Sequence, residues 1–129
     1  YASIHEFPLF PGTGLPTETG LANNVLNIIL RAGSDGAVYR QAFEQTLIPA
    51  LTRFKPELLM ISAGFDAHER DPLAGILLQD EDFGWMTEQL CAVAKRESAG
   101  HVLSVLEGGY DLHGLAGGVR QHLAVLQGL

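Results

Sequence analysis

Leu58-Leu-Met-Ile-Ser62, which runs directly into Ala63-Gly-Phe-Asp66, is the most informative segment about the fold. A short apolar run of this kind is typical of a strand buried on both faces of a parallel sheet. It ends in polar residues, Asp66 first and then His68 and Asp71. Because ligands of parallel α/β sheets bind just beyond the carboxyl ends of the strands, this stretch predicts a buried strand that delivers Asp66 to a candidate site.

Further strands and helices alternate on either side of this stretch. The patterns predict strands over 1–4, 25–30 and 101–106, and amphipathic helices over 38–54, 81–97 and 112–126. Ser34 or Asp35 can cap the first helix, and Pro49 within that helix predicts a kink or a break. The alternation implies an α/β fold of three αβα layers with a parallel sheet and right-handed crossovers.

Length and charge exclude several classes of protein. The 129 residues, 47% of them apolar, suffice for one modest core, so we expect a single domain over 1–129. Eight Lys and Arg against 15 Asp and Glu give a net charge of −7, and without a basic cluster we expect no direct binding of nucleic acid.

The expected location is the cytoplasm. The single cysteine, Cys91, has no partner for an intramolecular disulfide, and its place in an apolar helix face predicts a buried, unreactive side chain. The apolar stretches fall far short of the roughly 20 residues needed to cross a bilayer, so we expect no membrane insertion. The chain opens on Tyr1-Ala-Ser-Ile4, strand-like residues without an initiator Met, and is interpreted as a fragment.

Each candidate residue has a structural and a functional interpretation. Asp66 can be a metal ligand or the cap of the turn after the strand, and spacing alone favours the cap. His68 can be a second ligand or an exposed loop histidine, and the exposed loop is the preferred prediction. Tyr110, after Glu107-Gly-Gly109, can donate a hydrogen bond to a carbonyl or its oxyanion, or be a half-buried tyrosine at a turn. Asp71, followed by proline, is interpreted as a turn initiator.

Three ordered motifs together resemble the zinc-dependent histone deacetylase family, including its bacterial relatives that act on acetylpolyamines or related amides. The motifs are His5-Glu-Phe-Pro-Leu-Phe-Pro-Gly-Thr-Gly14, Ser62-Ala-Gly-Phe-Asp-Ala-His68 with Asp71-Pro-Leu73, and Glu107-Gly-Gly-Tyr110. The similarity extends over nearly the whole chain. It implies the carboxyl-terminal portion of a deacetylase domain with a partial arginase/deacetylase fold.

The resemblance also implies roles for individual residues. Asp66 would be one of three protein ligands of a catalytic Zn²⁺, and Tyr110 would polarise the scissile amide carbonyl. A narrow acyl-lysine channel would have Phe10 as one wall, Leu73 at its rim, and the pair Gly108 and Gly109 at its inner end. The substrate would be an acetylated lysine or an acetylated polyamine.

The family's other catalytic residues have no counterpart in this sequence. Its two remaining zinc ligands lie in an Asp-x-His segment and its general base in a His-His pair, both upstream of the position that resembles Tyr1. A catalytic zinc site takes three protein ligands, so the chain alone is expected to bind zinc poorly and to be inactive.

Two further readings compete with a deacetylase. The chain can be a non-catalytic unit that binds a partner or itself, since a parallel sheet cut in half leaves an unpaired edge and apolar surface; we therefore expect a homo-oligomer. A nucleotide-binding doubly wound domain ranks last, because the sequence has no G-x-G-x-x-G and no Walker-type Gly-Lys-Ser/Thr.

Overall fold

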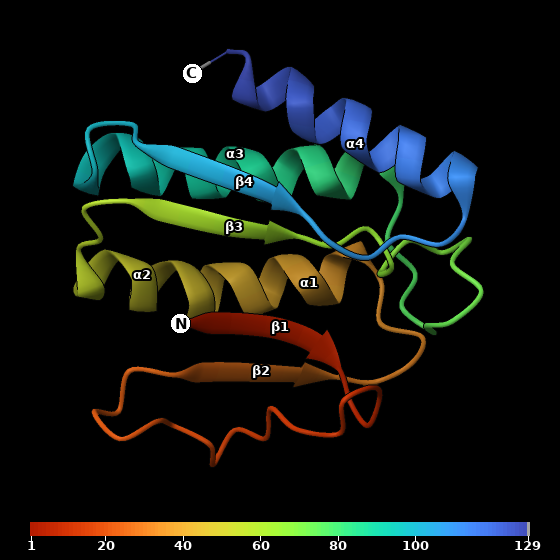
Figure 1. Cartoon of the computed structure of the whole chain (residues 1–129), viewed down its shortest axis with the longest axis horizontal. Helices are drawn as coiled ribbons and strands as arrows, with labels where there is room; N and C mark the ends of the chain where they lie inside the picture. The colour runs from red at the N-terminus through yellow and green to blue at the C-terminus, as the bar shows by residue number, and fades with distance from the viewer. Residues whose placement is uncertain (129) are drawn as a thin grey trace.

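The computed structural model of the chain describes residues 1–128 and shows strands alternating with helices (Figure 1). The elements are β1 (Ala2–Glu6), β2 (Leu26–Leu30), α1 (Gly36–Ala42), the π-helix η1 (Phe43–Leu47), α2 (Ile48–Phe54), β3 (Leu59–Ala63), α3 (Asp80–Glu97), β4 (Val102–Leu106) and α4 (Leu112–Leu126). The predicted order of strands and helices is confirmed. At most of their ends, the strands and helices begin or end one or two residues from the predicted position.

The strands form two parallel pairs. Strand β1 pairs with β2 and places Ala2 opposite Leu26, whereas β3 pairs with β4 and places Leu59 opposite Val102. Within residues 1–128 the two pairs share no strand hydrogen bonds, so the structure has two two-stranded sheets where one parallel sheet was predicted. All four arrows point the same way in Figure 1, which brings the carboxyl ends of the strands to one side of the molecule. The predicted α/β class with parallel strands is confirmed.

The segment from α1 to α2 runs as one helical path through Pro49. The Asp35 carboxylate caps its start by accepting a 3.1 Å hydrogen bond from the Val38 amide. The α-helix predicted over this range is divided just before Pro49: the π-helix η1 separates α1 from α2, and the Ile48 amide donates to the Phe43 carbonyl. This π turn places Pro49 in the first turn of α2, where a missing N–H leaves no helical bond unmade.

The hydrophobic core lies between the helices and the strands. Its centre comprises buried side chains from α1, η1, β3, the loop after β3, and α3: Tyr39, Phe43, Leu47, Ala63, Phe65, Ile76, Leu78 and Phe83. Partly buried residues of β1 and β2, among them Ile4 and Ile28, pack against this centre. Cys91 is buried and free, as predicted. Among residues 1–128, no helix has the length and apolar composition to cross a bilayer.

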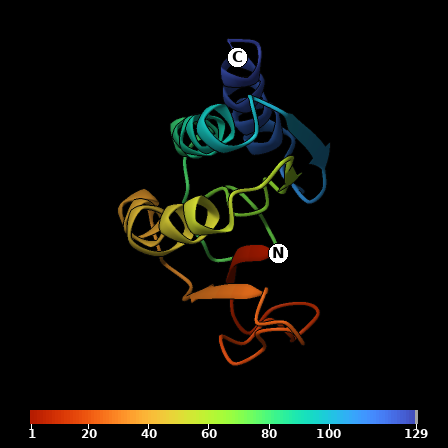
Figure 2. The same cartoon turned by 90° about the vertical axis from the view of Figure 1, so that its left-hand side faces the viewer.

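Helix α4 lies close to α3 and to the loop after β3 because glycines face both. A Cβ added to Gly118 would lie 2.7 Å from the Phe65 ring, and one added to Gly114 would lie 2.8 Å from the His68 ring. Neither distance is tolerated by a real side chain, so the small residues set how near α4 approaches. Figure 2 shows α1, α2 and α3 on one side of the strands.

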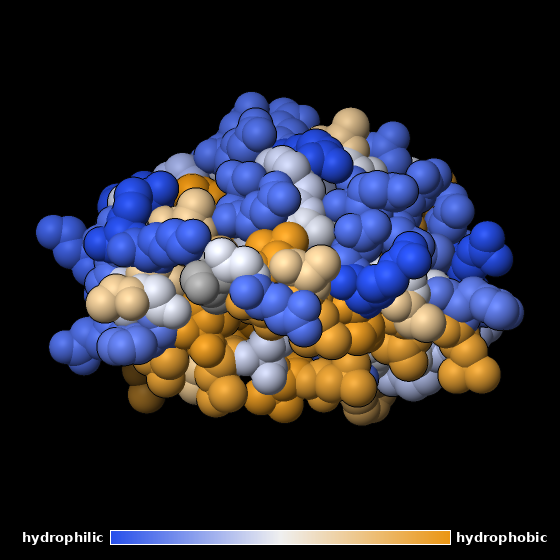
Figure 3. All heavy atoms as spheres, turned by 90° about the horizontal axis from the view of Figure 1, so that it is seen from above, coloured by the Kyte–Doolittle hydropathy of each residue, from blue (hydrophilic) through white to orange (hydrophobic). Residues whose placement is uncertain are grey.

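The β3–β4 sheet has one covered and one bare face. Leu59 and Ala63 are buried toward the helices, whereas Met60, Leu103 and Val105 point the other way and are 64%, 47% and 49% exposed. Figure 3 shows the resulting band of apolar side chains along the side of the molecule on which the strands lie. Burial of this strand on both faces, expected from its sequence, is thus wrong for residues 1–128, because nothing in that range covers the second face.

Candidate functional site

Two loops meet at the carboxyl ends of β3 and β4. The first spans 64–79 and the second spans 107–111. The Phe65 amide donates a 2.8 Å hydrogen bond to the Gly108 carbonyl, and the Glu107 amide donates a 3.0 Å bond to the Ala63 carbonyl. These bonds extend the β3–β4 ladder beyond the strands. The structure therefore brings the two predicted motifs side by side.

Asp66 lies directly against Gly108. A Cβ added to Gly108 would overlap the Asp66 carboxylate, and one added to Gly64 would lie 3.1 Å from its Oδ1 atom. Burial raises the pKa of Asp66; its own backbone amide lowers that pKa, and the negative charges of Asp71 and Glu107 raise it. Burial and the neighbouring negative charges disfavour the charged form of Asp66, so a positive group nearby is needed to stabilise that form.

A metal ion needs more ligands than this part of the chain places together. Within the described range, 1–128, no group of three or more His, Cys, Asp or Glu side chains lies close enough to hold a metal. A catalytic zinc site needs three protein ligands, and the resemblance implies one of them in these motifs, Asp66. The described residues therefore do not make a zinc site by themselves.

Tyr110 lies in the second loop, and the residue is 58% exposed. Its backbone amide donates a 2.9 Å hydrogen bond to Oδ2 of Asp71. The next residue, Asp111, caps α4 by accepting a 2.7 Å bond from the Gly114 amide. Tyr110 is thus held at a fixed turn, and its exposure fits both the functional and the structural interpretation.

The predicted channel residues differ in their surroundings. Gly108 and Gly109 adjoin Asp66 and Tyr110, and Gly109 adopts a φ of +138°, a conformation that favours glycine. Phe10 is fully exposed on the loop between β1 and β2, and Leu73 is 65% exposed after Pro72. The roles of Phe10 and Leu73 in a channel stay predictions.

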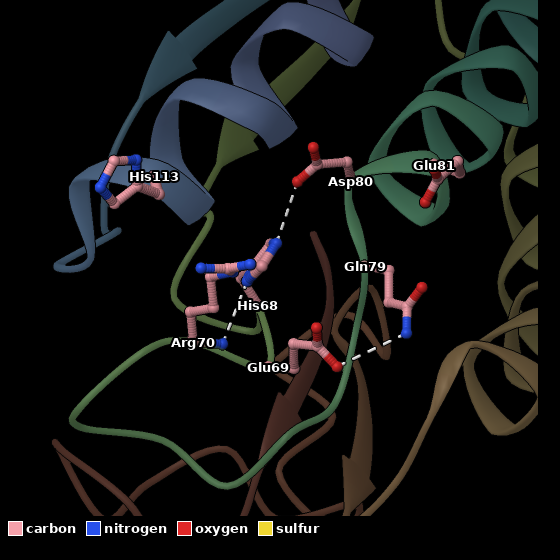
Figure 4. Close-up of a pocket in the computed structure, with 7 residues that line it drawn as sticks. All are labelled: His68, Glu69, Arg70, Gln79, Asp80, Glu81 and His113. Carbon is pink, nitrogen blue, oxygen red and sulfur yellow. Dashed lines mark hydrogen bonds and ion pairs between the residues drawn. The ribbon is translucent and has the colours of Figure 1, made fainter.

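His68 is buried, so the prediction of an exposed loop histidine is wrong. Its Nε2 lies 3.0 Å from Oδ1 of Asp80, while its Nδ1 accepts a 3.1 Å bond from the Arg70 amide. These bonds put the ring proton on Nε2 and leave neither nitrogen free to bind a metal. Figure 4 shows this pair beside an open polar pocket of about 390 Å³. Burial arises because the ring stacks on Phe83, a contact between the loop and α3 that the loop sequence does not reveal.

Tyr39 was not anticipated as a neighbour of Asp66, and Glu6 contacts the loop after β3. Tyr39 of α1 is buried, and burial, followed by the charges of Asp66 and Glu6, raises the pKa of its phenol far above the ordinary value. Glu6, at the end of β1, accepts a 2.7 Å bond from the Gly75 amide and so ties β1 to the loop after β3. The position of Tyr39 on a helix face carries no signal of its closeness to Asp66.

Comparison with known proteins agrees with the resemblance of the motifs. The family described as histone deacetylase domain matches residues 1–126. An uncharacterized protein of Synechocystis is 47% identical over 126 residues, and a histone deacetylase-like amidohydrolase of Pseudomonas aeruginosa is 40% identical over 114 residues. These alignments cover 98% and 84% of this chain but 40% and 30% of the two relatives.

A solved structure shows the same fold. The HDA15 HD domain superposes with a TM-score of 0.90 at 30% sequence identity, covering 99% of this chain and 37% of that one. The resemblance to the deacetylase family and the deacetylase-like α/β fold are thereby confirmed. The chain spans less than half the length of these relatives.

Proposed function

Because this chain belongs to the histone deacetylase family, we propose that it forms the carboxyl-terminal part of a zinc-dependent amidohydrolase that acts on acetyl-amides. The substrate class is acetyl-lysine or acetylpolyamine. The observation that carries the proposal is the junction of the two loops, where Asp66 packs on Gly108 and Tyr110 follows two residues later. Deacetylase motifs thus stand at the edge of the sheet where α/β proteins bind ligands.

Tyr110 is the catalytic residue that this chain supplies. When water adds to an amide carbonyl, negative charge gathers on the carbonyl oxygen, and a phenol held nearby stabilises that charge by donating a hydrogen bond. Asp66 is the metal ligand that this chain supplies. The remaining ligands and the general base come from outside this sequence, as the resemblance implies, so the chain alone is inactive.

The test is a chimera in which this chain replaces the matching segment of the Pseudomonas relative, 40% identical to it. We expect the purified chimera, loaded with zinc, to hydrolyse a fluorogenic acetyl-lysine or an acetylpolyamine. Tyr110→Phe abolishes this turnover, whereas Tyr1→Phe, the same change at an exposed position of the amino terminus, leaves it unchanged. A chimera that folds and binds zinc but shows no Tyr110-dependent hydrolysis contradicts the proposal.

The isolated chain provides the complementary measurement. Zinc titration is expected to show loose or no binding, with no turnover of acetyl-lysine, and Asp66→Ala is expected to change neither result. Stoichiometric zinc that depends on Asp66, together with turnover, would show that a second chain completes the site.

A second function, self-association without catalysis, is favoured by the bare face of the β3–β4 sheet. Met60, Leu103 and Val105 are exposed there together, and such a patch on a small chain tends to be covered. We expect a homo-oligomer in solution that Val105→Lys dissociates. Ala92→Lys, the same kind of change at an exposed position on α3, leaves the oligomer intact. A monomer mass by light scattering at all concentrations contradicts self-association.

The remaining expectations concern location and partners. We propose a cytoplasmic location on the basis of the single cysteine, which is buried and free. The net charge of −7 supports a partner other than nucleic acid.

A further inference from the structure

The carboxylate of Asp71 is buried, with the residue 8% exposed, and binds the backbones of two different loops. Its Oδ1 accepts a 2.9 Å hydrogen bond from the Leu73 amide in its own loop. Its Oδ2 accepts a 2.9 Å bond from the Tyr110 amide, 39 residues away in the sequence. Both bonds are charge-assisted and are stronger than bonds between neutral groups.

We propose that Asp71 is a positioning residue that fixes Tyr110 relative to Asp66. This inference rests on the proposed function, in which Tyr110 acts on the substrate and Asp66 on the metal. Asp71 itself touches neither substrate nor metal; it acts through the backbone of Tyr110. The turn-initiating role expected for Asp71 accounts for its bond to Leu73 but not for its bond to Tyr110.

The backbone on the amino-terminal side of Tyr110 has little intrinsic stiffness. Gly108 and Gly109 precede it, and both must be glycine, Gly108 to admit Asp66 and Gly109 because its φ is +138° and a Cβ would lie 2.9 Å from Leu115. Two consecutive glycines leave many conformations open to the chain. A bond from the Tyr110 amide to a buried carboxylate selects one of them.

Asp71 can serve as an anchor because its own loop is rigid. The His68 amide donates to the Phe65 carbonyl at 3.2 Å, and the Asp71 amide donates to the His68 carbonyl at 2.9 Å. The same loop pairs with the segment before α3 through the bond from the Leu78 amide to the Ala67 carbonyl at 3.1 Å. Asp66 and Asp71 thus belong to one hydrogen-bonded unit, and Tyr110 is attached to that unit.

Asn at this position separates the two bonds of the carboxylate. In Asp71→Asn, the amide oxygen still accepts from Leu73, as Asn does in turns, but the NH₂ group faces the Tyr110 amide and cannot accept from it. The variant therefore releases Tyr110 while leaving the turn at Leu73 in place. Thr87→Val is the matched control, since it disturbs a buried hydrogen bond between α3 and α4 that involves neither Asp71 nor Tyr110.

The first test is structural and independent of activity. In the unmodified chain, NMR is expected to detect scalar coupling across the hydrogen bond between the Tyr110 amide nitrogen and the Asp71 carboxyl carbon. Hydrogen exchange at the Tyr110 amide is expected to accelerate about tenfold or more in Asp71→Asn, relative to the Leu115 amide. Thr87→Val is expected to change the exchange rates of the Tyr110 and Leu115 amides by the same factor. Absence of the coupling, or exchange at Tyr110 as fast as in an unstructured peptide, overturns the proposal even if no Asp71 variant folds.

The second test is kinetic and uses the chimera. Asp71→Asn is expected to lower kcat about tenfold or more with KM changed less than twofold, because the phenol is misplaced where charge develops and not where the substrate binds. Thr87→Val leaves kcat per folded molecule unchanged. Unchanged kcat in Asp71→Asn overturns the positioning role. Full activity of Tyr110→Phe instead refutes the proposed function, while the NMR result still decides whether Asp71 holds Tyr110.

Discussion

The imidazole of His122 in α4 lies 2.7 Å, through Nδ1, from the hydroxyl oxygen of Thr87 in α3. The Thr87 hydroxyl donates its own proton to the Phe83 carbonyl at 2.6 Å, so Nδ1 of His122 carries the hydrogen in this contact. Nε2 then accepts from the Ser104 hydroxyl of β4 at 2.8 Å. A neutral histidine thereby joins three elements inside the protein.

Stability is predicted to fall in mild acid because of this histidine. Burial lowers the pKa of His122 below its ordinary value of 6.5. The unfolded chain therefore binds a proton near pH 6.5 that the folded chain does not bind until lower pH, and the free energy of unfolding decreases across that window. Above pH 6.5, His122 is neutral in both the folded and the unfolded chain, and its protonation no longer reduces the free energy of unfolding. Denaturant unfolding at several pH values checks this: His122→Asn flattens the dependence, and His101→Asn, at an exposed position, does not.

Removal of the Ser104 hydroxyl is predicted to destabilise the chain. Ser104→Ala leaves Nε2 of the buried His122 without its donor, which costs about 1–3 kcal/mol. Ser62→Ala, on the exposed side of β3, is the matched control and changes stability by less than about 0.5 kcal/mol. Equal unfolding free energies for the two variants would show that the bond between Ser104 and His122 contributes nothing.

Gly108→Ala is predicted to displace Asp66. The added Cβ overlaps the Asp66 carboxylate, so either the carboxylate or the loop must move, at a cost of about 1–3 kcal/mol. In the chimera we expect zinc affinity and turnover to fall together. Gly84→Ala is the control, because its Cβ meets Gln121 at an ordinary 3.4 Å. Unaltered zinc binding in Gly108→Ala would show that Asp66 is not the metal ligand.

Phe10→Ala is predicted to act on substrate binding and not on stability. The side chain is fully exposed, so its loss changes the unfolding free energy of the chain by less than about 0.5 kcal/mol. If Phe10 is a wall of the acyl channel, the chimera shows a raised KM for acetyl-lysine. Leu21→Ala, an equally exposed apolar residue of the same loop, leaves KM unchanged. Identical KM values for both variants would show that Phe10 does not line the acyl channel.

The order of the strands and helices and the chemistry of the motifs could be predicted from the amino-acid sequence. Periodicity is a local property, so the helix over 112–126 and the strand that leads to Asp66 could be predicted from neighbouring residues alone. The three motifs were sufficient to indicate the deacetylase family, to which the comparisons then assigned residues 1–126.

Which polar groups are buried, and what they bind, became known from the three-dimensional structure alone. The bonds of Asp71 to Tyr110 and of His122 to Thr87 join residues 39 and 35 positions apart. The burial of His68 depends on the Phe83 ring of α3, and the exposed face of the β3–β4 sheet depends on which face the helices pack against. Such contacts follow from the packing of whole elements, and packing depends on shape complementarity between distant segments, which no local pattern of residues encodes.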